Sequence, residues 1–140
     1  MTIYLTNGGP DNNLNVQKEE CGFIEIAPGS GAQIEFSSEA GWEQALCIYS
    51  DQRIQVTEKG TYHPERNLDP WSVPKNVTNR GQVYAITGWY KEGGPSARKP
   101  WNQSEVRTSF NSDGTITVGF DDGVKDGDYN DIVATVKFIQ

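Results

Sequence analysis

The sequence predicts an all-β protein, an antiparallel β-sandwich of about eight or nine short strands. Helical periodicity is almost absent, and short segments that alternate apolar and polar residues, or are rich in β-branched and aromatic residues, recur along the chain. Clusters of Gly, Pro, Asn and Asp separate these segments. Short strands with turns between them are typical of sandwiches.

Taken in chain order, the expected strands are 3–5, 21–26, 32–36, 45–49, 53–57, 82–90, 106–110, 115–120 and 132–138. The last is the clearest, because Ile132, Ala134, Val136 and Phe138 alternate with more polar positions. Turn signals stand at 7–10, 28–31, 58–60 and 111–114, and the last of these predicts a hairpin. The best helical candidate, 38–46, is short and contains a glycine.

Size and charge limit the function. The 140 residues suit a single domain over 1–140. The chain has no basic patch for a phosphate backbone, so we expect no nucleic-acid binding. No apolar run approaches the ~20 residues of a membrane span, so we expect no membrane insertion. The N-terminus lacks a basic region followed by an apolar one, so we expect a cytoplasmic location or export without a cleaved signal.

The cysteines and the histidine do not suggest a zinc site or a catalytic centre. Cys21 and Cys47 do not form a CxxC pair, and His63 is the single histidine, whereas zinc takes about four such ligands. A disulfide between the cysteines is one alternative, but buried thiols are the favoured prediction. The sequons at Asn76 and Asn102 are interpreted as chance occurrences.

The stretch 121–131, DDGVKDGDYND, carries most of the negative charge. It contains five aspartates and one lysine, a net charge of −4 out of −7 for the whole chain. Clustered carboxylates repel one another unless a cation neutralises them, and calcium takes six to eight hard oxygen ligands. The sequence therefore predicts a calcium site, and two ions would offset the local charge completely.

The spacing within this stretch supports the interpretation. In an extended backbone, Asp126, Asp128 and Asn130 project to one side, and a bend must bring in Asp131. An EF-hand is excluded, because a loop starting at Asp126 has Asp131 where glycine is needed and Lys137 where the bidentate glutamate belongs. A solvated acidic turn without metal is the remaining simple alternative.

The segment 126–131, Asp-Gly-Asp-Tyr-Asn-Asp, followed by an apolar strand, resembles the C-terminal motif of the bacterial calcium-dependent fucose/mannose-binding lectins. These are small β-sandwich proteins in which the sugar hydroxyls coordinate two bound calcium ions directly. The resemblance covers roughly the last 20 residues well and the first 16 loosely, and the middle of the chain does not align.

The resemblance implies a set of site residues. Asp126, Asp128, Asn130 and Asp131 match family metal ligands. Asp121-Asp122-Gly123 is similar to the family's E-D-G with one extra residue following, which leaves open whether Asp121 or Asp122 is the ligand; Asp121 is assigned to the metal. The family also uses an early asparagine followed by small residues, which Asn7, Gly8 and Gly9 resemble. The expected sugar-binding residues are Asn7, Gly8, Gly9, Asp122, Asp126, Asp128 and Asp131.

The predicted function is a calcium-dependent, non-catalytic carbohydrate-binding lectin, and the predicted assembly is a homo-oligomer, because avidity compensates weak single-sugar contacts. The alternative is a calcium-stabilised structural or adhesive domain that binds no sugar. A glycosidase is disfavoured, because its two carboxylates need different environments, whereas these crowd into one stretch. Trp71 and Trp101, in the long connections 63–80 and 91–103, could stack on a sugar, but packing onto the core is the favoured role.

Overall fold

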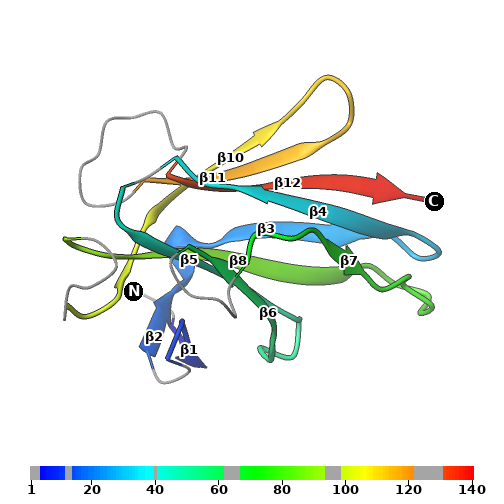
Figure 1. Cartoon of the computed structure of the whole chain (residues 1–140). Coiled ribbons are helices and arrows are strands. Elements are labelled where there is room, and N and C mark those ends of the chain that lie inside the picture. The colour runs from blue at the N-terminus through cyan, green and yellow to red at the C-terminus, as the bar shows by residue number, and fades with distance from the viewer. Residues whose placement is uncertain (1–3, 12–13, 40, 62–66, 94–98, 122–130) are drawn as a thin grey trace.

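The computed structural model describes residues 4–11, 14–39, 41–61, 67–93, 99–121 and 131–140. Within these residues the chain forms twelve strands and one short 3-10 helix, η1 (Lys18–Glu20), so the predicted all-β class is confirmed. Figure 1 shows two sheets packed face to face with a small hairpin beneath the lower one. No helix in the described part of the chain is long and apolar enough to span a membrane.

The first sheet of the sandwich has five strands, and each pairs antiparallel with its neighbour. In spatial order they are β10 (Glu105–Phe110), β11 (Ile116–Asp121), β12 (Ile132–Ile139), β4 (Gly31–Ser37) and β7 (Trp71–Val73). The hairpin predicted at 111–114 joins β10 to β11, and Gly114 adopts a φ of 89° there, which a residue without a side chain adopts readily.

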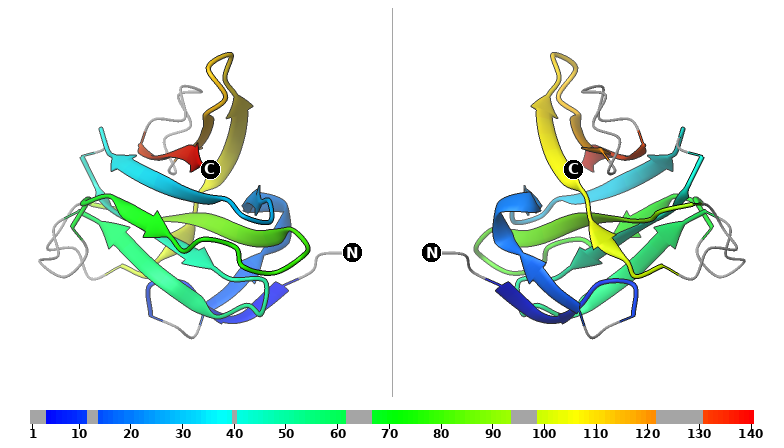
Figure 2. Two further views of the ribbon diagram at one scale, coloured as in Figure 1. Left: turned by 90° about the vertical axis from the view of Figure 1, so that its right-hand side faces the viewer. Right: turned by 90° about the vertical axis from the view of Figure 1, so that its left-hand side faces the viewer.

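The second sheet lies below the first in Figures 1 and 2. Its order is β3 (Gly22–Ile26), β8 (Gln82–Lys91), β5 (Glu43–Tyr49) and β6 (Gln55–Gly60), and the short β9 (Asn102–Gln103) also pairs with β8. The backbone N–H of Ser104 donates to the carbonyl of Gly88 over 2.8 Å. After Ser104 the chain leaves the second sheet and enters β10 of the first.

The main core lies between the two sheets. Because side chains alternate along a strand, every second residue of β5, β8, β11 and β12 points into this layer. The buried members of the core are Ile24, Ile26, Ala32, Ile34, Leu46, Ile48, Val73, Tyr84, Ile86, Ile116, Val118, Phe120, Ile132, Ala134 and Val136. The alternation predicted for 132–138 therefore decides which face of β12 is buried.

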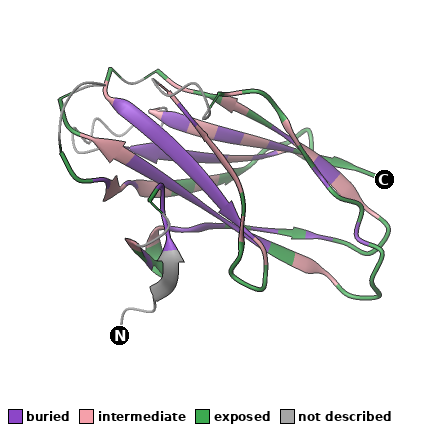
Figure 3. Ribbon diagram, turned by 60° about the horizontal axis from the view of Figure 1, so that its bottom comes forward, coloured by how far each residue is buried: buried purple, intermediate pink, exposed green. Residues whose placement is uncertain are grey.

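A second, smaller core covers the outer face of the second sheet. The hairpin of β1 (Tyr4–Gly8) and β2 (Leu14–Gln17) packs there, and the cluster comprises Val16, Cys21, Ala45, Cys47, Tyr49, Ala85, Trp89 and Trp101. All seven residues of β5 are consequently buried, since both of its faces are covered (Figure 3). Cys21 and Cys47 are free and buried, which confirms the prediction of two buried thiols.

All nine predicted strands exist, although β6 begins at Gln55 instead of residue 53 and β11 at Ile116 instead of residue 115. Three other strands were not predicted: β2, which has four residues, β7, which has three, and β9, which has two. Alternation cannot be recognised over so few positions, and prolines flank β7 on both sides. The described residues of the segment 38–46 are not helical, and β5 begins at Glu43.

Candidate functional site

The two ends of the acidic stretch lie side by side at one end of the first sheet. Asp121 is the last residue of β11, and Asp131 immediately precedes β12. Phe120 and Ile132 are register partners, and the Asp131 N–H donates to the Phe120 carbonyl over 3.1 Å. The intervening nine residues therefore connect two adjacent strand ends that the sheet fixes.

The described acidic side chains differ in exposure. Asp121 is 1% exposed, whereas Asp131 is half-buried. A buried carboxylate is costly unless hydrogen bonds or a cation compensate it. Both aspartates supply the hard oxygen donors that calcium takes, so the donor chemistry of these two residues fits that ion.

The remaining expected ligands, Asp122, Asp126, Asp128 and Asn130, lie outside the described residues. In the part of the chain that the structure describes, no group of three or more His, Cys, Asp or Glu residues could hold a metal ion. A complete site would therefore need donors from the residues between Asp121 and Asp131.

The end of β4 also reaches this site, which sequence reasoning missed. Ser37 pairs with Val133, and the Ser38 hydroxyl donates to the Asp131 carbonyl over 2.5 Å. This contact brings the β4–β5 connection to the start of β12, although Ser38 and Asp131 are 93 positions apart. A small polar residue after a predicted strand was the only signal in the sequence, and many turns share it.

Gly8 and Gly9, expected at the same site, lie elsewhere. An ideal Cβ on Gly8 would lie 2.6 Å from Val16 Cγ2, and Gly9, with a φ of 81°, donates its N–H to the Tyr49 hydroxyl over 2.7 Å. Both glycines pack on the outer face of the second sheet, and the first sheet lies on its opposite face (Figures 1 and 2).

The structure therefore does not bring Gly8 and Gly9 to Asp121 and Asp131. Asn7 belongs to the same strand, β1, so we no longer include these three residues in the candidate site. The physical reason is that the small residues serve a tight turn and close packing against Val16 and Tyr49.

Both tryptophans of the long connections pack onto the protein. Trp71 lies on β7 and packs edge-on against Tyr84, with ring centroids 6.1 Å apart. Trp101 is 6% exposed and belongs to the second core, and the Lys91 ammonium lies 4.8 Å from its ring centroid. Packing is thus the role that the structure gives them.

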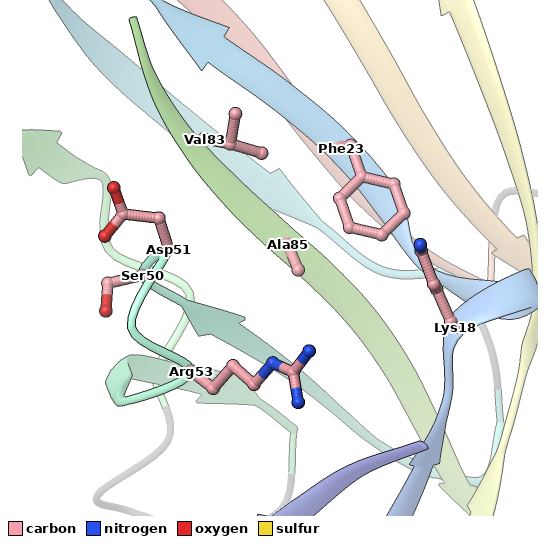
Figure 4. Close-up of a pocket in the computed structure, with 7 residues that line it drawn as sticks. All are labelled: Lys18, Phe23, Ser50, Asp51, Arg53, Val83 and Ala85. Atoms are coloured by element: carbon pink, nitrogen blue, oxygen red, sulfur yellow. The ribbon is translucent and has the colours of Figure 1, made fainter. Parts of the chain in front are cut away.

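A separate hollow of about 190 Å³ lies on the outer face of the second sheet (Figure 4). Phe23, Val83 and Ala85 form its apolar part, and the polar residues at its edge are Lys18, Ser50, Asp51 and Arg53. It is smaller than most pockets for drug-sized ligands, which measure about 300–1,000 Å³. It lies apart from Asp121 and Asp131, and we assign it no function.

The fold is that of bacterial sugar-binding lectins, as three solved structures show. A Chromobacterium violaceum lectin in complex with α-methyl-fucoside has a TM-score of 0.52 and 16% identity, covering 85% of this chain and 95% of that one. The C-terminal domain of a Burkholderia cenocepacia lectin has a TM-score of 0.54 and 16% identity, covering 82% and 92%. The high-affinity mannose-binding lectin of Ralstonia solanacearum has a TM-score of 0.52 and 18% identity, covering 85% and 95%.

No protein-family model matches the sequence, and no curated protein matches it. At these identities the likeness concerns the fold. The resemblance that the C-terminal motif suggested is confirmed at that level, because the similar structures are bacterial lectins, one of them in complex with a fucoside and one of them mannose-binding.

Proposed function

We propose that the protein is a calcium-dependent lectin without catalytic activity, whose site is the acidic stretch between β11 and β12. The observation that carries the proposal is the fixed juxtaposition of Asp121 and Asp131 at the end of a sandwich shared with sugar-binding proteins. The five aspartates of the stretch 121–131 provide the charge that a divalent cation needs.

The proposed metal ligands are Asp121, Asp126, Asp128, Asn130 and Asp131, and two calcium ions would balance the local charge of −4. Bound calcium would supply coordination positions for vicinal sugar hydroxyls and withdraw charge from them. The aspartates, Asp122 included, would accept the hydroxyl protons in charge-assisted hydrogen bonds. The strand pair β11–β12 would hold the two ends of the stretch in register, which lowers the ordering cost of binding.

The second candidate is a calcium-stabilised structural or adhesive domain that binds no sugar. The burial of Asp121 favours it, because a carboxylate that is 1% exposed is well placed to be saturated by protein groups and an ion. The two candidates differ in whether the bound ion keeps open positions for a ligand.

A glycan array in millimolar calcium, repeated in EDTA, tests the proposal. Sugar signals that disappear with EDTA are the expected result and would identify the ligand class. The double variant Asp128→Ala/Asp131→Ala should abolish calcium binding in a calorimetric titration, whereas Asp69→Ala, an exposed aspartate outside the stretch, should leave it unchanged. An unchanged titration of the double variant would exclude this calcium site.

Two further outcomes separate the candidates. No glycan signal in either condition, combined with a melting temperature that still rises with calcium, would favour the structural domain over the lectin. Sedimentation tests the proposed homo-oligomer, and a monomer at working concentration would remove the avidity argument while leaving the sugar site in place.

A further inference from the structure

Trp42 and Tyr90 form a stacked aromatic pair at the end of the second sheet. Their ring centroids are 5.9 Å apart and the ring planes differ by 23°. Trp42 directly precedes β5, and Tyr90 lies near the end of β8, where it is the register partner of Gln44. Both aromatic residues are half-buried, so part of their surface remains accessible.

The pair continues the inner face of the second sheet. Tyr84 and Ile86 of β8 belong to the main core, and Gly88, the next residue on that face, lies against the Phe120 ring. Tyr90 follows Gly88 on the same face, about 7 Å further along the strand. It therefore lies one step beyond the residue that contacts Phe120.

This position is close to both ends of the acidic stretch. The Phe120 carbonyl accepts the Asp131 N–H, so Phe120 stands at the base of the stretch. Ser38, which directly follows β4 of the same sheet, contacts the Asp131 carbonyl. Trp42 follows Ser38 by four residues, which span at most about 14 Å. Figure 1 shows the β4–β5 connection at the same end of the sandwich as the end of β11 and the start of β12.

Core packing does not account for the pair. Neither Trp42 nor Tyr90 belongs to the two described cores or to the partly buried residues that pack against them. By contrast, Trp101 belongs to the second core, and Trp71 packs against the main one. The stacked rings thus lie outside both described cores.

We infer that Trp42 and Tyr90 form an apolar subsite for a second sugar ring, next to the sugar held by the acidic stretch. This inference rests on the proposed function and adds that the ligand is an oligosaccharide of two or more residues. Aromatic faces suit the apolar C–H face of a sugar ring, and the indole N–H and phenol O–H can bond hydroxyls at its edge. The sugar ring at the calcium site binds through its hydroxyls, whereas the neighbouring sugar ring would pack on this apolar surface.

The test compares the Kd of a monosaccharide and of an oligosaccharide ending in it, both chosen from the array, in millimolar calcium. In the wild-type protein the oligosaccharide should bind more tightly. Trp42→Ala and Tyr90→Ala should weaken oligosaccharide binding about fivefold to tenfold, the magnitude of one stacking contact, and change monosaccharide binding less than twofold. Phe23→Ala is the matched control, because Phe23 is a 43% exposed aromatic residue on the outer face of the second sheet.

Trp42→Phe separates a binding role from a structural one. It keeps an aromatic face and should retain most of the oligosaccharide affinity, whereas Trp42→Leu, which keeps apolar bulk but no ring, should lose it. Equal oligosaccharide Kd values for Trp42→Phe and Trp42→Leu would overturn the subsite. So would an equal loss of affinity for the monosaccharide and the oligosaccharide. A wild-type protein that binds a monosaccharide in calcium but gains nothing from the second ring would overturn the subsite and leave the lectin proposal intact. A protein that binds no glycan at all would overturn both.

Discussion

The Phe120 ring of β11 packs directly against the backbone of Gly88 in β8, and this contact joins the two sheets below the acidic stretch. An ideal Cβ on Gly88 would overlap the first ring atoms of Phe120. Phe120 is fully buried, and its carbonyl accepts the Asp131 N–H. Because Gly88 has no side chain, the Phe120 ring can pack against its backbone. This contact sets the distance between the second sheet and the end of β11.

Replacing Gly88 with alanine should destabilise the fold. The added methyl group would push Phe120 out of its position, and overpacking of a dense core costs about 1–3 kcal/mol. Chemical denaturation of Gly88→Ala would measure the loss of unfolding free energy. Gly41→Ala is the control, because a Cβ there meets nothing within 4 Å. Replacing the ring with the smaller leucine side chain, in Gly88→Ala/Phe120→Leu, should recover part of the lost unfolding free energy. If the free-energy losses of the two single variants simply add in the double variant, the direct contact is contradicted.

The Tyr49 hydroxyl links the β1–β2 hairpin to the second sheet. It accepts the Gly9 N–H over 2.7 Å, so Tyr49→Phe would leave a buried donor without its acceptor and should cost about 1–3 kcal/mol at neutral pH. The measurement is the unfolding free energy at pH 7. An unchanged stability would show that water or another group replaces the hydroxyl.

The same residue should make stability depend on alkaline pH. Burial, followed by the proximity of Cys47, raises the pKa of Tyr49 above its ordinary value of 10.0. The folded state then holds this proton more tightly than the unfolded state, so its contribution is complete below pH 10 and is lost as the pH rises above it. Tyr49→Phe should lose stability less steeply between pH 9 and pH 11. Burial also raises the pKa of Tyr84, so part of the slope should remain.

Both thiols should be unreactive in the folded protein. Burial, with smaller contributions from Glu19 and Glu20, raises the pKa of Cys21 to about 12, and Cys47 is completely buried. Only about one Cys21 side chain in ten thousand is then a thiolate at pH 8, and the thiolate is the reactive form. A colorimetric thiol reagent should titrate neither cysteine at pH 8 and both in denaturant. Rapid labelling without denaturant would contradict the burial.

Asp121→Asn tests the buried end of the proposed calcium site. The amide keeps the shape of the side chain and removes one ligand charge, and charge count tunes calcium affinity. We expect the calcium Kd to weaken about tenfold or more by calorimetry, while Asp69→Asn leaves it unchanged. Because removing a buried charge avoids its desolvation, the calcium-free melting temperature should fall little. An unchanged Kd would remove Asp121 from the ligand set and leave Asp122 as the alternative.

Local patterns were sufficient for much of the fold. The alternation from Ile132 to Val136 identifies β12 and its buried face, although Phe138, the next residue on that face, is 38% exposed. The turn ending at Gly114 identifies the β10–β11 hairpin. Both signals depend on neighbouring residues only. Three short strands were missed, because segments of two to four residues are too short to show a period. Asn-Gly-Gly was interpreted as part of the site because its chemistry suits that role, whereas the structure uses it as a turn beside Tyr49.

The sequence by itself determined the class of fold, the two buried thiols, and the position of an acidic stretch directly before the last strand. The tertiary structure decided which distant segments meet that stretch: Ser38 contacts it, Gly8 and Gly9 do not, and Trp42 stacks on Tyr90 at the same end. The reason is that strand propensity and alternation are local, whereas the order of strands in a sheet depends on long-range pairing that no short pattern encodes.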